Sequence, residues 1–281
     1  MSAAKRPSAG QPTPDPGDDS PVQQPESTPA AKAAGDPVID EVEAISSDDP
    51  DAVLVHQHTP VASLDELRAA MQWAFENEDI TPGVLDQFAQ HARLVLQGNQ
   101  RMNLTAIVEP REVAAKHYLD SWRATRLLPL VGRTVLDLGT GAGFPGMPVA
   151  LAEPQTKLVL LDSTRKRVDF VKETLTALGM TRATATWERG EDHLARHRYD
   201  MVLMRAVSSV RENVRLLRKV KHSHKDLLML KGASWSREVR AAEREAERLG
   251  FRLDTVWEHK LPGDLGARAI LVYRAPGGQG N

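Results

Sequence analysis

A glycine-rich segment with a carboxylate before it is the part of this sequence best suited to binding a nucleotide-like ligand. Residues 134–147 read TVLDLGTGAGFPGM, with glycines at positions 139, 141, 143 and 146 after an apolar run. Glycine permits the positive φ of a tight turn, and its missing Cβ lets backbone amides approach a bound nucleotide. The segment therefore predicts a buried strand, a tight turn and a helix that starts near residues 144–146.

Asp137 bears on which ligand this loop would take. Residues 141–146 also satisfy the dinucleotide fingerprint G-x-G-x-x-G. A carboxylate two residues before Gly139 would repel a pyrophosphate, but it suits a cofactor that carries an ammonium and a sulfonium. Asp162 ends the apolar run 157–161 and could accept hydrogen bonds from both ribose hydroxyls. Asp162 alone fits NAD equally well, whereas the two acids together favour S-adenosylmethionine.

Composition sets broad limits on the kind of protein. The chain has 281 residues, 41% of them hydrophobic, which is enough for a sizeable core. It contains no apolar run of membrane-spanning length and no apolar signal-peptide core, so we expect a soluble, non-exported, cytoplasmic protein. The absence of cysteine excludes disulfides, thiolate metal sites and cysteine nucleophiles. No pattern of metal ligands stands out, and we expect no metal.

Charge is distributed unevenly along the chain. Residues 1–60 hold three Lys or Arg against eleven Asp or Glu, and nine of the 18 prolines fall in the first 50 residues. Such a Pro/Ala-rich acidic segment buries too little apolar surface to offset its ordering entropy, so we expect residues 1–60 to be a disordered tail. The remainder carries an excess of positive charge, which is compatible with a polyanionic partner.

Residues 61–130 have helical periodicity and are expected to form an N-terminal helical layer. Ser63 and Glu66 have the spacing of a capping box, and further helices are expected over residues 81–96 and 112–128. Asn103, His117, Asp120 and Ser121 place polar groups in otherwise apolar surroundings of this layer. Helix caps and satisfied core polar groups are an alternative explanation of these four residues.

Strands and helices alternate from residue 131 to residue 275. Strands are expected at residues 134–138, 157–162, 182–187, 199–205 and 227–231, with a helix over 164–178, a turn at 188–192, a charged helix over 236–249 and a final antiparallel pair at 251–258 and 267–273. This order implies an α/β fold with a mostly parallel, doubly wound sheet, followed by a flexible end at 276–281. Ligands of such sheets bind beyond the carboxyl ends of the strands, where Asp137, Gly139, Gly141, Phe144, Asp162, Gly190, Glu191 and Arg205 all fall.

A run of cations follows the fourth expected strand. Six Lys or Arg lie within 15 residues, at Arg211, Arg215, Arg218, Lys219, Lys221 and Lys225. A solvated helix face would explain them, and so would contact with RNA phosphates. If four of them touched phosphates, the logarithm of affinity would fall with the logarithm of salt at a slope of about −3 to −4.

The sequence resembles the bacterial small-subunit ribosomal RNA methyltransferase family RsmG, also called GidB. The likeness covers roughly residues 80–275 and rests on the motifs at 103–105, 117–121, 137–146, 161–167, 190–191, 205–208 and 230–232. The G-x-G-x-G-F-P-G loop joined to R-A-x-x-S and L-K-G is far more specific than a general methyltransferase fingerprint. The chain departs from the family where Gln97-Gly98 replace the usual Lys-Trp, and residues 1–60 have no counterpart.

The resemblance implies a Rossmann-like class I methyltransferase sheet with helices on both faces, with S-adenosylmethionine as the cofactor. It implies that Gly139 and Phe144 line the methyl donor, that Gly190 and Glu191 border its adenosine part, and that Arg205 contacts it. Asp162 would hold the ribose, as in related folds. Substrate contacts are expected from Asn103, His117, Asp120, Ser121 and Lys231.

The reaction that the resemblance implies is methylation of N7 of a specific guanine in 16S ribosomal RNA. N7 carries a free lone pair, so no general base is needed, and we assign no catalytic base. The expected partner is small-subunit rRNA or the ribosomal subunit, with the enzyme acting as a monomer. The alternatives are a methyltransferase acting on another RNA or a small molecule, an NAD-dependent oxidoreductase, and a non-catalytic RNA-binding module.

Overall fold

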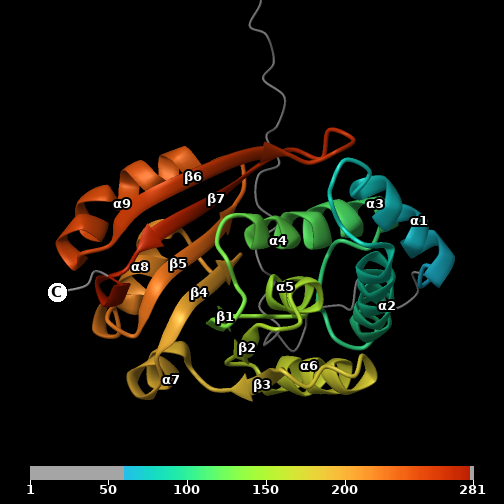
Figure 1. Cartoon of the computed structure of the whole chain (residues 1–281), viewed down its shortest axis with the longest axis horizontal. Helices are drawn as coiled ribbons and strands as arrows, with labels where there is room; N and C mark the ends of the chain where they lie inside the picture. The colour runs from blue at the N-terminus through green and yellow to red at the C-terminus, as the bar shows by residue number, and fades with distance from the viewer. Residues whose placement is uncertain (1–59, 279–281) are drawn as a thin grey trace, which may run out of the picture. The chain divides into compact units, whose positions relative to one another are not determined.

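The strands of the protein form one mixed sheet. A computed structural model of the chain describes residues 60–278, and in that part of the chain seven strands pair in the order β3-β2-β1-β4-β5-β7-β6 (Figure 1). The strands are β1 (Thr134–Leu138), β2 (Lys157–Asp162), β3 (Ala183–Trp187), β4 (Tyr199–Arg205), β5 (His224–Lys231), β6 (Arg252–Lys260) and β7 (Ala267–Arg274). The acidic tail expected at 1–60 lies outside the described residues except for Pro60.

The pairing confirms the expected doubly wound sheet. The first five strands run parallel, β1 pairing with β2 on one side and β4 on the other. The last two are antiparallel, with β7 inserted between β5 and β6. The strand order therefore reverses at β1, which places the switch point between β1 and β4.

Helices cover both faces of the sheet (Figure 1). The core on one face includes residues of α1 (Leu64–Ala74), α2 (Pro82–Asn99), η1 (Val113–Leu119), α4 (Asp120–Arg123), η2 (Ala124–Arg126), α5 (Gly146–Ala152) and α6 (Arg165–Ala177). The short α3 (Pro110–Glu112) leads into η1 and buries no residue. The other face packs on α7 (Gly190–Arg196), α8 (Val210–Leu216), η3 (Leu217–Lys219) and α9 (Trp235–Leu249). Alternation along β1 divides its side chains between the two cores, with Val135 in the first and Leu136 in the second.

Local sequence explains where several helices begin and end. Ser63 and Glu66 form the expected capping box at α1, and Pro82 occupies the first turn of α2, where a missing amide donor costs nothing. Gly250 ends α9 with a φ of 84°, which glycine adopts without strain.

None of the described helices is long and apolar enough to cross a membrane.

Three segments differ in detail from the sequence expectations. The third helix is a continuous helical stretch from Pro110 to Arg126 that contains a π-helical segment, η1. Residues 190–196, expected to begin as a turn, form the short helix α7. Of the expected flexible end, Pro276–Gly278 form the 3-10 turn η4, and residues 279–281 lie outside the described range.

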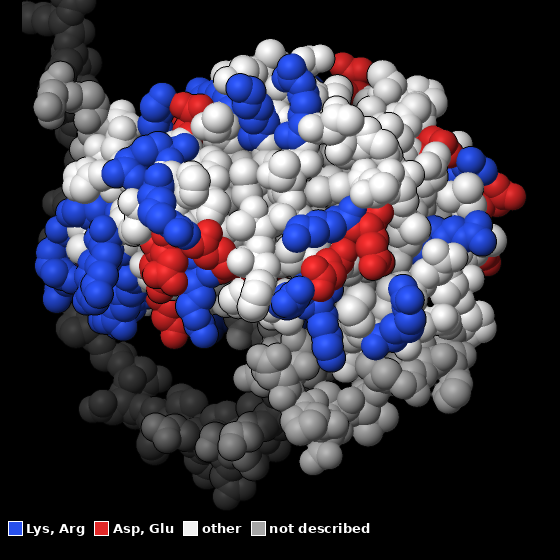
Figure 2. Space-filling view, turned by 90° about the horizontal axis from the view of Figure 1, so that it is seen from below, with Lys and Arg blue, Asp and Glu red and all other residues white. Residues whose placement is uncertain are grey.

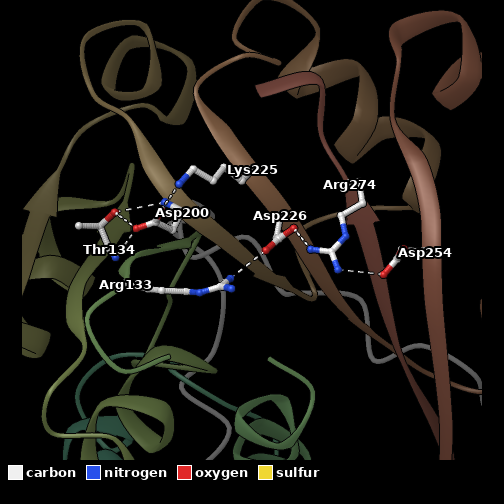
Figure 3. Close-up of polar contacts among 7 residues, drawn as sticks. All are labelled: Arg133, Thr134, Asp200, Lys225, Asp226, Asp254 and Arg274. Carbon is white, nitrogen blue, oxygen red and sulfur yellow. Dashed lines mark hydrogen bonds and ion pairs between the residues drawn. The ribbon is translucent and has the colours of Figure 1, made fainter. Parts of the chain in front are cut away.

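A network of charged residues joins the amino ends of β1, β4 and β5 to the carboxyl end of the antiparallel β7 (Figure 3). Asp226 of β5 is 3% exposed and accepts from Arg133 at 3.0 Å and from Arg274 of β7 at 2.5 Å. Asp200 of β4 accepts from the Thr134 amide at 2.9 Å and from Lys225 at 2.7 Å. These bonds join β1, β4, β5 and β7 at the edge of the sheet opposite the carboxyl ends of the parallel strands.

Candidate functional site

The carboxyl ends of β1, β2 and β4 surround the glycine-rich loop, which connects β1 to α5. The amides of Gly139 and Thr140 donate to the carbonyl of Leu161 at 2.8 and 3.0 Å, so the loop is fastened to the end of β2. Gly139 has a φ of 78°, and a Cβ on it would lie 2.9 Å from Val207. The loop can therefore follow this path only with glycine at that position.

Asp137 lies beneath the loop and is completely buried. Its Oδ2 accepts from the Thr140 hydroxyl at 2.6 Å and from the Gly146 amide, at the start of α5, at 2.8 Å. Its Oδ1 is buried with no hydrogen-bond partner among the described residues. Burial raises the pKa of Asp137 to about 7, although the bonds from Thr140 and Gly146 act in the opposite direction.

Asp162 ends β2 and also organises the loop. Its Oδ2 accepts from the Gly141 amide at 2.9 Å, and its Oδ1 accepts from the Thr164 amide at 2.8 Å. The structure thus brings two carboxylates to the ends of adjacent parallel strands, as the sequence predicted. Each oxygen of Asp162 has accepted one hydrogen bond and retains a second lone pair for a ligand hydroxyl.

Arg205, at the end of β4, joins the sheet to the helical layer. Its Nη2 donates to Nδ1 of His117 at 2.6 Å, and its Nη1 donates to the Ser121 hydroxyl at 3.2 Å. The His117 ring stacks on Phe144 with centroids 4.5 Å apart, and the Arg205 guanidinium lies 5.6 Å from the centre of the same Phe144 ring. Four predicted site residues from three separate segments, Arg205, His117, Ser121 and Phe144, therefore form one cluster.

The protonation of His117 follows from its partners. Arginine can only donate, so Nδ1 of His117 accepts, and the ring proton resides on Nε2, which bonds the Thr105 hydroxyl at 2.9 Å. Burial, together with the neighbouring Arg205 charge, holds the pKa of His117 well below its usual value. His117 is therefore neutral with both nitrogens engaged, a poor arrangement for a general base.

The remaining predicted substrate residues lie in other contacts. Oδ1 of Asp120 lies 3.1 Å from Nε2 of His259 on β6, and Lys231 donates to the Ser208 carbonyl at 2.5 Å and pairs with Glu238 at 2.8 Å. Asn103 is half-buried, and no hydrogen bond of its side chain is recorded among the described residues. Gly190 packs on β1, since a Cβ there would lie 2.5 Å from Leu138, and Glu191 is half-buried in the first turn of α7.

Three supporting residues were not identified as site residues from the sequence. Asn99 accepts from the amides of Leu104 and Thr105 at 2.7 and 2.9 Å and so shapes the turn that carries Thr105. His91 is fully buried; its Nδ1 lies 2.8 Å from the Tyr118 hydroxyl, and its ring is tilted against Phe144 at 5.4 Å. The third is His259, the partner of Asp120. Only the buried polar character of these residues could have indicated them.

Gly98 stands where the resembling family has an aromatic residue, and the fold compensates for its small size. A Cβ on Gly98 would lie 2.7 Å from the ring of Phe170 on α6 and 3.0 Å from Leu104. Phe170 therefore fills the space beside Gly98, next to the turn that precedes Thr105.

The residues present suit S-adenosylmethionine. The loop and its surroundings offer buried Asp137 with an unpartnered oxygen, Asp162 with lone pairs not used in hydrogen bonds, and open space at Gly141, where a Cβ would meet nothing within 4 Å. Carboxylates suit the positive charges of this cofactor, and its hydroxyls suit Asp162. Within residues 60–278, no cluster of three or more His, Asp or Glu is arranged to hold a metal ion.

Comparison with known proteins places these residues in context. A family model described as GidB, rRNA small subunit methyltransferase G, matches residues 84–262, a range that contains every predicted site residue. "Ribosomal RNA small subunit methyltransferase G" of Solibacter usitatus is 36% identical over 214 residues, covering 73% of this chain and 100% of that protein. The protein of the same name from Carboxydothermus hydrogenoformans is 35% identical, covering 66% of this chain and 81% of that protein.

Solved structures show more distant likeness. TrmN from Thermus thermophilus aligns with a TM-score of 0.44 and 18% identity, covering 58% of this chain and 53% of that chain. The mitomycin 7-O-methyltransferase MmcR aligns with a TM-score of 0.46 and 17% identity, covering 76% of this chain and 69% of that chain.

Proposed function

Because the chain belongs to the rRNA small subunit methyltransferase G family, we propose that it methylates N7 of a specific guanine in 16S ribosomal RNA, with S-adenosylmethionine as the methyl donor. The observation that carries the proposal is the convergence of Asp137, Asp162, Phe144 and Arg205 at the carboxyl ends of β1, β2 and β4, within the range that the family model matches. This Rossmann-like sheet is that of class I methyltransferases.

The proposed methyl transfer requires that guanine N7 be aligned with the methyl group, and it does not require removal of a proton. S-adenosylmethionine, when bound, supplies an electrophilic methyl group on a sulfonium. Guanine N7 attacks with its lone pair, so the N7–C bond forms as the S–C bond breaks, and no protein group has to take up a proton. Alignment of two reactants can supply effective molarities of about 10⁵ to 10⁸ M. We call the site at the carboxyl ends of β1, β2 and β4, bordered by Asp137, Asp162, Phe144 and Arg205, the crevice. A neutral His117 fixed by Arg205 and Thr105 suits such a site, because it supports Arg205 and Phe144 without acting as a base.

In this proposal the predicted residues divide between two tasks. Asp137, Gly139, Gly141, Phe144, Asp162, Gly190, Glu191 and Arg205 hold the cofactor, and Asn103, His117, Asp120, Ser121 and Lys231 border the substrate side. His117 and Ser121 support Arg205 directly, so loss of either is expected to affect both tasks. We further propose a monomer that acts in the cytoplasm on rRNA or on the small subunit. Analytical ultracentrifugation would test the monomer.

The test is transfer of a labelled methyl group from S-adenosylmethionine to deproteinised small-subunit rRNA and to intact subunits, with the labelled nucleoside identified. Label in 7-methylguanosine supports the proposal. Label on another base, or on a small molecule only, overturns the substrate assignment. Binding of NADH without binding of S-adenosylmethionine would instead favour the oxidoreductase alternative.

A further inference from the structure

A groove between α8 and α9 gathers arginines outside the crevice. It has a volume of about 640 Å³ and is lined by Arg211, Arg215, Arg240, Ala241, Glu243, Arg244, Glu245 and Arg248. Five guanidinium groups face two carboxylates there, an excess of three positive charges. We call this surface the arginine groove.

Both helices start close to the carboxyl ends of parallel strands, where the crevice lies. α8 begins five residues after Arg205 ends β4, and α9 begins four residues after Lys231 ends β5. Arg240, Arg244 and Arg248 are each four residues apart, so they form one stripe along α9 with steps of about 6 Å. The groove therefore leads away from the crevice along both helices. Figure 2 shows Lys and Arg at several places on one face of the molecule, with a dense group beside acidic residues at the end where Figure 1 places α8 and α9.

Hydrogen bonds hold part of the groove ready for an anion. Nε of Arg211 and Nε of Arg215 both donate to Oε2 of Glu245, at 3.2 and 2.7 Å. No recorded hydrogen bond within residues 60–278 uses the terminal Nη atoms of these two arginines, whose side chains are 50% and 49% exposed. Glu245 thus orders the two guanidinium groups while their outer edges stay available.

The arginines of the groove could instead serve only to pair with acidic residues of the protein, but Arg240 and Arg244 argue against this. Both are exposed on α9, and no ion pair of either is recorded within residues 60–278. An internal network would pair each arginine, whereas here one glutamate serves Arg211, Arg215 and Arg248. Guanidinium forks with free edges suit phosphate oxygens, and an open groove lined by several of them suits an extended polyanion rather than an enclosed small ligand.

The structure shows that the six cations of residues 211–225 differ in their partners. Lys225 pairs with Asp200 at the amino edge of the sheet, and Lys221 donates to the Leu249 carbonyl at the end of α9. Both lysines are occupied in holding the fold together. Of the six cations, only Arg211 and Arg215 line the groove, and three arginines of α9 join them.

We propose that the arginine groove binds phosphates of the rRNA that flanks the methylated guanine, as a second contact outside the crevice. The inference rests on the proposed RNA substrate. The groove would add affinity and hold the substrate in register, because phosphate contacts fix orientation without reading sequence.

The test compares two double variants of the full-length protein. Arg240→Gln with Arg244→Gln removes two charges from the groove without breaking a recorded ion pair. Arg93→Gln with Lys172→Gln is the matched control, since it removes two exposed charges from α2 and α6 on the other face of the sheet. Binding to deproteinised 16S rRNA is measured over a range of salt concentrations, without methyl transfer. Binding of S-adenosylmethionine and thermal unfolding report whether each variant is intact.

The groove variant is expected to bind rRNA more weakly and to reduce the magnitude of the salt slope by about 1.4 to 1.8, with cofactor affinity and thermal unfolding unchanged. The control is expected to keep the slope of the unmodified protein. An unchanged slope in the groove variant, or an equal loss in the control, overturns the proposal. Failure of the proposed function gives a different result from failure of this inference. If rRNA binding depends on the groove but no 7-methylguanosine forms, the RNA-binding role of the groove is supported and the assignment of guanine N7 is wrong.

Discussion

Nη2 of Arg205 lies 2.6 Å from Nδ1 of His117, across 88 positions of the sequence. This bond joins the end of β4 to η1 in the helical layer, and the Phe144 ring packs against both partners. One guanidinium group thus links the loop, the sheet and the helical layer, which also share a hydrophobic core.

Replacement of Arg205 tests this dependence. Arg205→Ala would leave Nδ1 of His117 without a donor, at a cost of about 1–3 kcal/mol in the free energy of unfolding, whereas the Ser121 hydroxyl would still donate to the His117 carbonyl. We expect methyl transfer to fall about a hundredfold, because misplacement by about 1 Å is enough for such a loss. Arg205→Lys should recover little of it, since one ammonium lacks the fork that serves two partners. Activity of Arg205→Lys equal to that of the unmodified protein would contradict the argument.

The affinity for S-adenosylmethionine should depend on pH through Asp137. Burial raises the pKa of Asp137 to about 7, so the carboxyl is half protonated near neutral pH in the free protein. A cationic ligand favours the carboxylate, so affinity should rise from pH 6 to pH 8 with release of a proton. Asp137→Asn should abolish both the rise and the proton release. Titration calorimetry in buffers of different ionisation enthalpy measures both, and a flat profile for the unmodified protein would confine Asp137 to holding the loop.

Acid should destabilise the fold through buried histidines. Burial lowers the pKa of His91 to about 3 and that of His224 to about 4. The unfolded chain takes up these protons below about pH 6.5 and the folded chain does not, so each histidine removes about 1.4 kcal/mol of unfolding free energy per pH unit until its folded pKa is reached. Asp137 offsets one of them, because its raised pKa adds stability as pH falls from 7 to 3.8.

His224→Gln isolates one of these contributions. His224 is buried at the amino end of β5, away from the crevice. Denaturant unfolding between pH 4 and pH 7 should show a pH dependence that is shallower by about one proton. The exposed His222→Gln serves as the control. Identical profiles for both variants would rule out His224 as a source of the acid sensitivity.

Gly146 should be intolerant of even one methyl group. A Cβ there would lie 2.5 Å from Leu160 and 2.6 Å from Oδ2 of Asp137, so Gly146→Ala has to displace the bond that fixes the loop. We expect a loss of about 1–3 kcal/mol in unfolding free energy, typical of overpacking, and weaker cofactor binding. Gly83→Ala, in the first turn of α2 with nothing within 4 Å, should leave both unchanged or slightly raise stability.

Replacement of Asp226 should lower the free energy of unfolding without changing the affinity for S-adenosylmethionine. Asp226→Ala removes the carboxylate shared by Arg133 and Arg274, but both arginines are partly exposed and Arg274 keeps Asp254, so we expect a loss of about 1–3 kcal/mol in unfolding free energy. Because this network lies at the amino ends of β1, β4 and β5, opposite the proposed cofactor site (Figure 3), cofactor affinity of the folded variant should not change. A changed affinity would show that the two edges of the sheet are coupled.

The sequence by itself determined the elements and the ligand type. Period-two and period-3.6 patterns, the Ser63 capping box and the glycines of residues 139–146 depend only on local physics, so they predicted most strands and helices and the place of the loop. Asp137 and Asp162 end adjacent strands, so their convergence followed from parallel order alone. The π-helical segment and α7 were not foreseen, because neither has a distinct local pattern.

Only the tertiary structure decided which polar side chains meet. Arg205 and His117 are partners because β4 ends beside the helical layer, a contact between segments whose separate patterns say nothing about each other. The same is true of Asp120 with His259 and of Lys231 with Glu238. Lys225 and Arg211 both belong to the cation run, yet Lys225 pairs with Asp200 of the neighbouring strand, whereas Arg211 lines the arginine groove. Side-chain pairing over long separations is set by packing of whole elements, which a local pattern does not encode.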